Sequence, residues 1–438
     1  MSIHAESDRR ATSLTAADPF GYLRRFDFIL EPFEIDTHFL RPTEGIIGNR
    51  VVIEGRELIS YSSYNYLGYS GDARVQAAAK SAIERYGTSV SASRLLAGEK
   101  PLHRELERQI ASLIGAEDCL AFVSGHATNV TTIGCLFGPK DLILYDVLSH
   151  NSIQQGIRLS GAQCFPFPHN NVRAVDSLLA AHRAQRQRAL VVTEGVFSMD
   201  GDIAPIPEFI DVKQRHRASL MIDEAHSMGV IGRSGRGIVE HFELDPASVD
   251  LWMGTLSKSF ASCGGYVAGR RALVESLRYA APGFAYSCGL TPANAAAALE
   301  AARCLEREPQ RVARLIENAD RFRALAARAG IDTGLSDGAA VVPAILGSSI
   351  LSVVVAGLLF KRGILVHPLF YPVVPERSSR LRFFLTTLHS EDEIARTVDS
   401  LVEAAAEARA LFESMPPGLA EQVLRAAAAS DSSLEADE

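Results

Sequence analysis

Short apolar runs recur along the first two thirds of the chain, and each is closed by glycine or polar residues. They share aliphatic or β-branched side chains and lie at 119–125, 141–146, 189–195, 219–226 and 250–257. Helix-like segments such as 101–115, with apolar positions three or four residues apart, separate them. Strands that alternate with helices predict an α/β fold with a mostly parallel sheet and crossover connections.

A different pattern begins near residue 300. The segment 297–330 is helix-like, and 364–370 and 380–386 are strand-like, which predicts a smaller α+β domain. The expected organisation has four parts, which are a partly disordered N-terminal arm (1–50), a large domain (51–300), a small C-terminal domain (301–414) and an acidic flexible tail (415–438).

The apolar stretch 339–360 is long enough to span a bilayer. However, Pro343 and the run 347–349 (Gly-Ser-Ser) interrupt its middle, so a buried strand followed by a helix explains it better. We therefore expect no membrane span. The apolar second half, 350–360, leaves contact with a partner or with a membrane surface open.

Composition narrows the classes of function. The 438 residues carry a formal net charge of -8, which argues against a nucleic-acid partner because phosphate-binding surfaces are basic. The six cysteines contain no C-x-x-C pair, so neither a disulfide framework nor a zinc site is indicated. We expect no metal, and a reducing, cytoplasmic compartment.

Polar clusters follow several of the predicted strands. They are Ser124–Gly125, Asp223–His226 and Thr255–Lys258. Ligands of parallel α/β sheets bind beyond the carboxyl ends of the strands. The three clusters therefore predict one shared site.

Lys258 stands between small hydroxyl residues and a run of glycines, where the flanking pattern indicates burial. A buried lysine loses its proton, pairs with a carboxylate or takes part in chemistry. The hydroxyls of Thr255 and Ser257, with nearby glycine amides, suit a phosphate group. A neutral amine beside a phosphate site is what a Schiff base with pyridoxal phosphate requires. The segment alone leaves an ordinary surface lysine open.

The sequence MIDEAH, 221–226, adds a carboxylate at a strand end. Asp223 could keep a pyridine nitrogen protonated there, and His226 follows three residues later. The letters DEAH also spell a helicase and ATPase signature. That function requires a G-x-x-x-x-G-K-[ST] loop, and neither Gly-Lys-Ser nor Gly-Lys-Thr occurs in the chain.

Three further features complete the predicted site. Gly125 and His126 offer backbone amides where a strand turns into a helix, which suits phosphate. His150 follows another strand and could stack on an aromatic cofactor, although a lone histidine is more often structural. Arg380 and Arg382 share one face of a strand, where one could bind a carboxylate in a bidentate manner.

Five segments together resemble the α-oxoamine synthases, which are fold-type I pyridoxal phosphate enzymes. The segments are SYNYLG (63–68), VTEGVFSMDGDIAP (192–205), IDEAHSMGVIGRSGRG (222–237), GTLSKSFASCGGYVAG (254–269) and RLRFFLTTLH (380–389). The resemblance runs from about residue 50 to 405. It implies a large sheet domain with a smaller C-terminal domain, as in aspartate aminotransferase.

The resemblance also implies roles for single residues. Lys258 would form the Schiff base and act as acid and base, Asp223 would pair with the pyridine nitrogen, and His226 with the ring phenolate oxygen. The other implied contacts are ring stacking and substrate contact for His150, phosphate binding for Gly125, His126, Thr255 and Ser257, the amino-acid carboxylate for Arg382, and supporting positions for Glu194 and Ser198. Tyr64 and Asn65 would approach from the neighbouring subunit of a homodimer.

The implied reaction is a decarboxylative Claisen-type condensation. A small amino acid (serine, glycine or alanine) would react with an acyl thioester, carried by coenzyme A or an acyl carrier protein, to give an α-aminoketone. An aminotransferase of the same fold and a non-catalytic partner subunit are the alternatives. Such partner subunits lack the lysine that Lys258 supplies.

Overall fold

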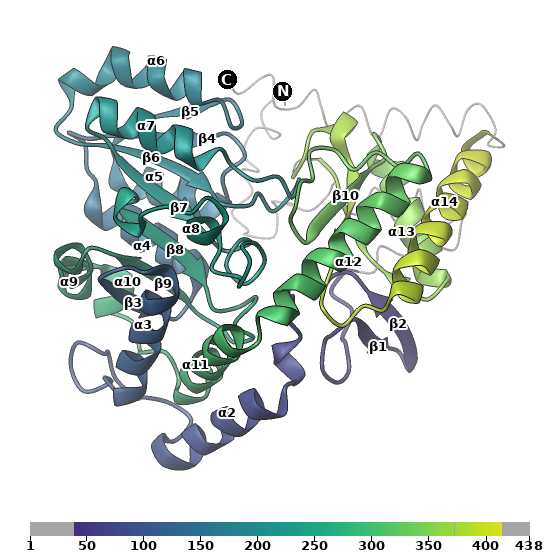
Figure 1. Cartoon of the computed structure of the whole chain (residues 1–438), viewed down its shortest axis with the longest axis horizontal. Coiled ribbons are helices and arrows are strands. Elements are labelled where there is room, and N and C mark those ends of the chain that lie inside the picture. The colour runs from purple at the N-terminus through teal and green to yellow at the C-terminus, as the bar shows by residue number, and fades with distance from the viewer. Residues whose placement is uncertain (1–38, 372, 414–438) are drawn as a thin grey trace, which may run out of the picture. The chain divides into compact units, whose positions relative to one another are not determined.

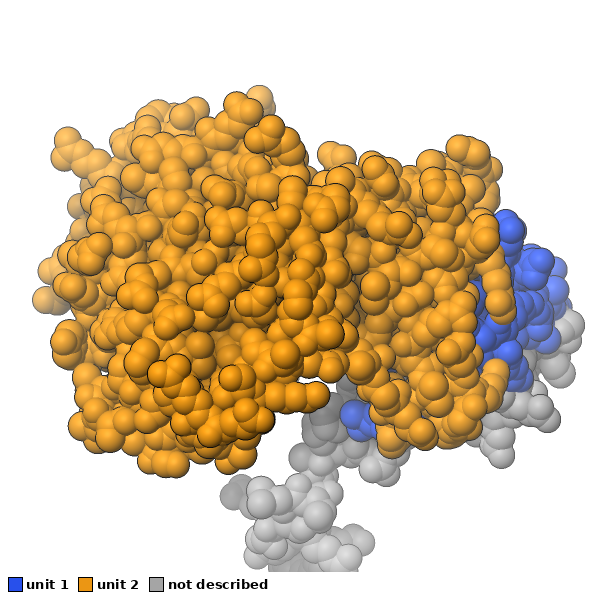
Figure 2. Space-filling model, turned by 60° about the horizontal axis from the view of Figure 1, so that its bottom comes forward, with its two compact units in different colours: residues 1–41, 345–381, 399–438 blue, residues 42–344, 382–398 orange. Residues whose placement is uncertain are grey.

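The computed structural model describes residues 39–371 and 373–413. They form two compact units: unit 2 comprises 42–344 and 382–398, and the other described residues belong to unit 1 (Figure 2). The predicted tail (415–438) and most of the predicted arm (1–50) lie outside the described residues. The predicted domain boundaries stay a prediction.

A seven-stranded sheet lies at the centre of unit 2 (Figure 1). Its strands are β3 (Asp118–Phe122), β4 (Leu142–Asp146), β5 (Gln163–Phe167), β6 (Ala189–Glu194), β7 (Ser219–Asp223), β8 (Leu251–Thr255) and β9 (Gly265–Gly269). The spatial order is β3-β9-β8-β7-β6-β4-β5. Neighbours from β8 through β5 pair in parallel, whereas β9 pairs antiparallel with β3 and β8. The predicted mostly parallel α/β sheet is confirmed.

Helices connect these strands, as the apolar periodicity predicts. Those of unit 2 are η3 (Tyr69–Gly71), α2 (Ala73–Tyr86), α3 (Pro101–Ile114), α4 (Gly125–Leu136), α5 (Asn151–Ser160), α6 (Val172–His182), η4 (Arg183–Gln185), α7 (Ile206–His216), α8 (Ile238–His241), η5 (Pro246–Ser248), α9 (Arg271–Ala280), α10 (Pro282–Ala285), α11 (Pro292–Arg307) and α12 (Pro309–Arg328). The helix-like segment 297–330 thus forms most of α11 and all of α12.

The core of unit 2 is built on the apolar faces of the strands. Leu120, Ile143, Val192, Met221 and Val267 belong to one buried cluster, into which side chains of α4, α5 and α9 also pack. Burying aliphatic side chains on both faces accounts for the nearly continuous apolar runs of the parallel strands. The same burial leaves the polar residues to gather at the strand ends.

The remaining elements lie outside the central sheet. They are β1 (Arg50–Ile53), β2 (Arg56–Ser60), β10 (Val341–Ile345), α13 (Ser349–Lys361), β11 (Ile364–Leu365), β12 (His367–Leu369), η6 (Glu376–Ser378), β13 (Arg380–Phe384) and α14 (Glu391–Glu413). β1 and β2 form a hairpin whose two turn residues, Glu54 and Gly55, both have positive φ, as a tight hairpin turn requires. The strand-like segments 364–370 and 380–386 are confirmed as β11, β12 and β13.

The apolar stretch 339–360 forms a strand, β10, and then a helix, α13, as predicted. Ser348 begins the helix, and its hydroxyl accepts a hydrogen bond from the amide of Leu351. The side chains from Val353 to Phe360 are buried, which accounts for their apolar character. Among the residues that the structure describes, no helix is both long and apolar enough to cross a membrane.

Candidate active site

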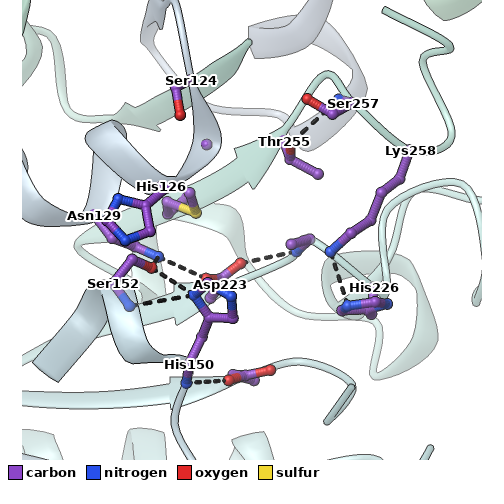
Figure 3. Close-up of a pocket in the computed structure, with 14 residues that line it drawn as sticks. Ser124, His126, Asn129, His150, Ser152, Asp223, His226, Thr255, Ser257 and Lys258 are labelled. Carbon is purple, nitrogen blue, oxygen red and sulfur yellow. Dashed lines mark hydrogen bonds between the residues drawn. The ribbon is translucent and has the colours of Figure 1, made fainter. Parts of the chain in front are cut away.

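A cavity of about 210 Å³ lies at the carboxyl ends of the central strands (Figure 3). The residues that line it come from the ends of β3, β4, β6, β7 and β8 and from the first turns of α4 and α5. They are Ser124, Gly125, His126, Asn129, His150, Ser152, Glu194, Asp223, Ala225, His226, Met253, Thr255, Ser257 and Lys258. The structure thus brings together most of the residues that the sequence proposed for one site.

Lys258 extends into this cavity from the loop after β8. Its Nζ lies 2.8 Å from Nε2 of His226 and 5.6 Å from the ring centroid of Tyr64. Burial lowers the pKa of the Lys258 amine to about 8, although the carboxylates of Asp223 and Glu194 act in the opposite direction. A substantial fraction of this amine is therefore neutral, and nucleophilic, near physiological pH.

His226 is buried between Lys258 and a tyrosine. Its Nδ1 lies 2.8 Å from the hydroxyl of Tyr66, which is fully buried. Burial, reinforced by the charges of Lys258 and Arg382, lowers the pKa of His226 well below its ordinary value, so the ring is neutral. Tyr66 belongs to the SYNYLG segment, but sequence reasoning assigned it no role.

Asp223 lies at the end of β7 and is 4 % exposed. Its Oδ1 accepts a hydrogen bond from the amide of Ala225 at 2.9 Å, and its Oδ2 accepts one from Nδ2 of Asn129 at 2.8 Å. Asn129 also donates to the hydroxyl of Ser152, at 3.0 Å (Figure 3). Sequence reasoning missed Asn129, although it stands one helical turn after Gly125.

His150 precedes α5 and caps its first turn. Its backbone amide donates to Oε1 of Glu194 at 2.7 Å, and its Nδ1 lies 2.7 Å from the hydroxyl of Ser152. The amide of Ser152 also donates to Nδ1, at 3.3 Å, so Nδ1 is an acceptor and the neutral ring carries its proton on Nε2. Partial burial of the ring lowers the pKa of His150, and the charge of Lys258 acts in the same direction.

Glu194 holds the backbone of His150 through the hydrogen bond that the His150 amide donates. Glu194, at the end of β6, is 3 % exposed. Burial, together with the nearby charge of Asp223, raises the pKa of the Glu194 carboxyl well above its ordinary value. The backbone hydrogen bond to His150 fixes the position of the turn that carries this histidine.

The N-terminus of α4 and the loop after β8 form a compact cradle. A Cβ atom on Gly125 would lie 2.9 Å from the hydroxyl oxygen of Thr255, so the two segments approach more closely than another residue permits. Thr255 accepts the amide hydrogen of Ser257 at 3.1 Å and donates to the carbonyl of Gly264 at 3.0 Å. Helix-start amides at Gly125 and His126 beside these hydroxyls make an environment suited to phosphate.

These residues fit pyridoxal phosphate. The cradle suits its phosphate, the buried carboxylate of Asp223 suits its pyridine nitrogen, and the largely neutral amine of Lys258 suits its aldehyde. Asn129 also lines the cavity, and its side-chain oxygen is buried without a hydrogen-bond partner in the described part of the chain. The donor set therefore matches the cofactor that the sequence predicts.

Arg382 and Ser198 lie beside the cavity and do not line it. Nη1 of Arg382 donates to the backbone carbonyl of Ser198 at 3.0 Å, and the guanidinium lies 4.5 Å from the ring centroid of Phe384. The charge of Arg382 lowers the pKa values of both Lys258 and His226, so it acts directly on the site. The contact of Ser198 is thus made by its backbone.

Tyr64 and Asn65 were expected to approach from a neighbouring subunit, and for Tyr64 this position needs correction. Its ring lies 5.6 Å from Lys258 and 6.2 Å from His226 of its own chain. The loop after β2 brings it there. Asn65 instead uses both ends of its side-chain amide locally, donating to the carbonyl of Ile47 and accepting from the amide of Ser70.

Comparisons with known proteins agree with this geometry. Residues 56–401 match the model of the family described as aminotransferase class I and II. An 8-amino-7-oxononanoate synthase from Geobacter sulfurreducens is 42 % identical over 371 residues, which cover 84 % of this chain and 94 % of that protein. The same-named protein from Fervidobacterium nodosum is 38 % identical over 363 residues, with 82 % and 91 % covered.

A solved structure of serine palmitoyltransferase from S. paucimobilis, with a bound PLP–myriocin aldimine, superposes with a TM-score of 0.85. It is 29 % identical and covers 89 % of this chain and 98 % of its own. The chain belongs to the α-oxoamine synthases, within the aminotransferase class I and II family. It is a pyridoxal phosphate-dependent acyltransferase that condenses an amino acid with an acyl thioester.

Proposed function

We propose that this α-oxoamine synthase condenses a small amino acid, which is serine, glycine or alanine, with an acyl thioester to give an α-aminoketone and carbon dioxide. The buried amine of Lys258, 2.8 Å from His226 and with its pKa lowered to about 8, carries the proposal. Two names among the similar proteins, serine palmitoyltransferase and 8-amino-7-oxononanoate synthase, support the same reaction type.

When bound, pyridoxal phosphate takes up the electron pair that the α-carbon of the amino acid releases. The chain's own groups supply the rest. Lys258 in its neutral form accepts the α-proton and returns a proton at the end of the reaction. Asp223, held by Asn129 and the Ala225 amide, would pair with the pyridine nitrogen and keep it protonated.

The remaining groups orient the two substrates. In this proposal Arg382, which lies beside the cavity with Nη1 on the Ser198 carbonyl, binds the carboxylate of the amino acid. The phenol ring of Tyr64, 5.6 Å from Nζ of Lys258, limits the space beside that amine. The Nε2–H of His150 is available to the carbonyl oxygen of the thioester, because the hydroxyl and the amide of Ser152 both donate to Nδ1. This placement would stabilise charge on that oxygen as the new carbon–carbon bond forms.

The test is a substrate screen with the purified, cofactor-loaded protein. Serine, glycine, alanine and threonine are each combined with acyl-coenzyme A donors of increasing chain length and with acylated carrier protein. We expect thiol and carbon dioxide to be released together for one of the small amino acids. Exchange of the amino group with a keto acid, without thiol release, would instead establish an aminotransferase. This is the alternative activity, and the matched family also carries that name.

We also propose that two copies of the chain associate, in the cytoplasm. Leu96 and Tyr286 lie on two neighbouring loops and are 82 % and 90 % exposed. Two hydrogen bonds join these loops: the hydroxyl of Ser93 donates to the carbonyl of Ala285, and the amide of Gly289 donates to the carbonyl of Ala92. Apolar side chains that gather into a contiguous exposed patch mark protein interfaces, and the joined loops bring two such side chains to one region of the surface. The six free cysteines suit a reducing compartment. A fully active monomer in analytical sedimentation would refute the association.

A further inference from the structure

His169 lies in the loop between β5 and α6, outside the cavity. Its Nδ1 is 3.0 Å from Oδ1 of Asp146, and its Nε2 is 2.9 Å from Oδ2 of Asp202. The side chain of Asp146 is fully buried, and those of Asp202 and His169 are 9 % and 16 % exposed. One imidazole therefore bridges two buried carboxylates that are 56 positions apart in the chain.

This bridge requires a charged imidazole. A neutral ring has one N–H and can donate to only one carboxylate, whereas an imidazolium donates to both. Burial lowers the pKa of His169, but the hydrogen bonds and charges of Asp146 and Asp202 outweigh it and raise the pKa to about 10. Among the described residues, the other groups that contact the ring are uncharged. Phe197 packs against it, and Nδ2 of Asn170 lies beside Nε2 because both nitrogens donate to Oδ2 of Asp202.

The Asp146 side of the bridge leads to His150. Asp146 ends β4, and its Oδ1 also accepts the amide hydrogen of Leu148 at 2.9 Å. The carbonyl of Asp146 accepts the amide hydrogen of Ser149, also at 2.9 Å. The turn that delivers His150 to the cavity is thus folded around the carboxylate that His169 holds.

The Asp202 side leads to Arg382. The carbonyl of Asp202 accepts the amide hydrogen of Phe197 at 3.1 Å, and the ring of Phe197 packs edge-on against His169 at 4.4 Å between centroids. The next residue is Ser198, whose carbonyl accepts the hydrogen bond from Arg382 at 3.0 Å. The same imidazole therefore contacts the turn that holds Arg382.

We propose that His169 is a positioning residue: as a bridge between Asp146 and Asp202 it sets the distance between the turn of His150 and the Ser198–Arg382 contact. The inference rests on the proposed function, in which His150 serves the thioester and Arg382 the amino acid. Small displacements of such groups are costly, because reacting groups must be held within a fraction of an ångström. His169 itself touches neither substrate.

The first test replaces His169 by glutamine in the cofactor-loaded enzyme. A glutamine amide can donate from one atom only, so one carboxylate would face an oxygen. We expect the Kd for the amino acid, measured by spectral titration, to rise roughly tenfold, and kcat/KM to fall roughly 10- to 100-fold. The control is His182→Gln, whose ring stacks on Phe165 at 4.5 Å; we expect its constants to stay within about twofold.

Two further variants separate positioning from a general structural role. Asp202→Asn loosens the side that leads to Arg382, so it should raise the amino-acid Kd more than it lowers kcat. Asp146→Asn loosens the side that leads to His150 and should do the reverse. Equal, proportionate losses in both variants, or a folded His169→Gln enzyme with wild-type constants, would overturn the proposal.

A measurement on the unmodified enzyme decides the matter if the variants fail to fold. Nitrogen-15 NMR of histidine-labelled protein should show both ring nitrogens of His169 protonated at pH 8, and a ring that titrates near its ordinary value would contradict the bridge.

Arg382→Ala is measured in parallel. If it leaves the amino-acid Kd unchanged, the proposed substrate contact is wrong; if it weakens binding and His169→Gln does not, only the inference about His169 fails.

Discussion

The amine of Lys258 shows how far the surroundings change one side chain. At pH 7.5 a lysine with an ordinary pKa is neutral in roughly one molecule in a thousand, whereas one with a pKa near 8 is neutral in about a quarter. The change comes chiefly from burial in the cavity wall. A neutral amine is what both covalent binding of an aldehyde and removal of a proton require.

Replacement of Lys258 by alanine should abolish catalysis. We expect kcat/KM to fall by at least about a thousandfold, because the proposed mechanism makes this amine both the covalent anchor of the cofactor and the acid and base. Reduction with borohydride should no longer attach the cofactor to the chain. Turnover of the variant at the wild-type rate would remove Lys258 from the mechanism.

The pKa of Lys258 also predicts how the cofactor loads. Below pH 8 the amine is mostly ammonium and unreactive, and above pH 8 it is mostly neutral. The rate at which the cofactor-free protein binds pyridoxal phosphate covalently should therefore rise between pH 7 and 9, with a midpoint near 8. Stopped-flow absorbance measures this rate, and a midpoint near 10.5 would contradict the burial of the amine.

Asn129 should affect cofactor binding and catalysis, because its side chain donates a hydrogen bond to Asp223. Asn129→Ala removes the 2.8 Å hydrogen bond to a buried carboxylate, a loss of about 1–3 kcal/mol if nothing replaces it. We expect weaker cofactor retention and roughly tenfold lower kcat. Equilibrium dialysis and steady-state kinetics measure both. Gln155→Ala is a suitable control, because within the described ranges the Gln155 side chain bonds only to the exposed Asn151.

At the scale of elements, the site depends on how closely β9 approaches the N-terminus of α4. A Cβ on Gly265 would lie 2.6 Å from the Cα of Gly125 and 2.9 Å from its backbone nitrogen. The hydroxyl oxygen of Thr128 would be nearer still, at 2.5 Å, but it belongs to a side chain, whereas the two backbone atoms of Gly125 cannot rotate away. The close approach places the first amides of α4 against Thr255, at the end of β8, and the loop that carries Lys258.

Gly265→Ala should therefore separate the two elements. We expect a destabilisation of about 1–3 kcal/mol in chemical unfolding, together with weaker cofactor binding. Gly138→Ala is the matched control, because a Cβ there meets nothing within 4 Å, and its effect should stay within about 0.5 kcal/mol. Equal effects of the two substitutions would show that the close approach of β9 to α4 contributes nothing to stability or cofactor binding.

At the scale of the whole molecule, His169 links stability to pH. Its pKa rises from 6.5 in the unfolded chain to about 10 in the folded one. A raised pKa means that folding favours the protonated form, so the contribution is fully present below pH 6.5 and is lost as the pH rises through about 10.

The free energy of unfolding of the wild type should thus exceed that of His169→Gln by more at pH 6.5 than at pH 10. Denaturant titrations of both proteins at the two pH values measure the difference, and comparison with the variant cancels the titration of other groups. A difference that does not change with pH would show that the bridge is not an ion pair in the folded protein.

Local patterns accounted for most of the architecture. The runs 189–195 and 219–226 became β6 and β7 because aliphatic side chains that are buried on both faces leave an unmistakable apolar run. β5 and β9 escaped notice for physical reasons. β5 is an edge strand that contains Pro166, and β9 begins and ends with glycine, so neither has the residue pattern of a typical strand.

The cofactor of the site could be predicted from the sequence, since Lys258, Asp223 and His226 stand in short motifs that resemble those of pyridoxal phosphate enzymes. The hydrogen-bond partners of these side chains could not be predicted from the sequence. Asn129 meets Asp223 across 94 positions, and His169 meets Asp202 across 33, through contacts that leave no periodic trace. The amino-acid sequence therefore predicted which side chains belong to the site. Only the tertiary structure decided their protonation, their hydrogen-bond partners and the distances between them, because burial and charge act through space and not along the backbone.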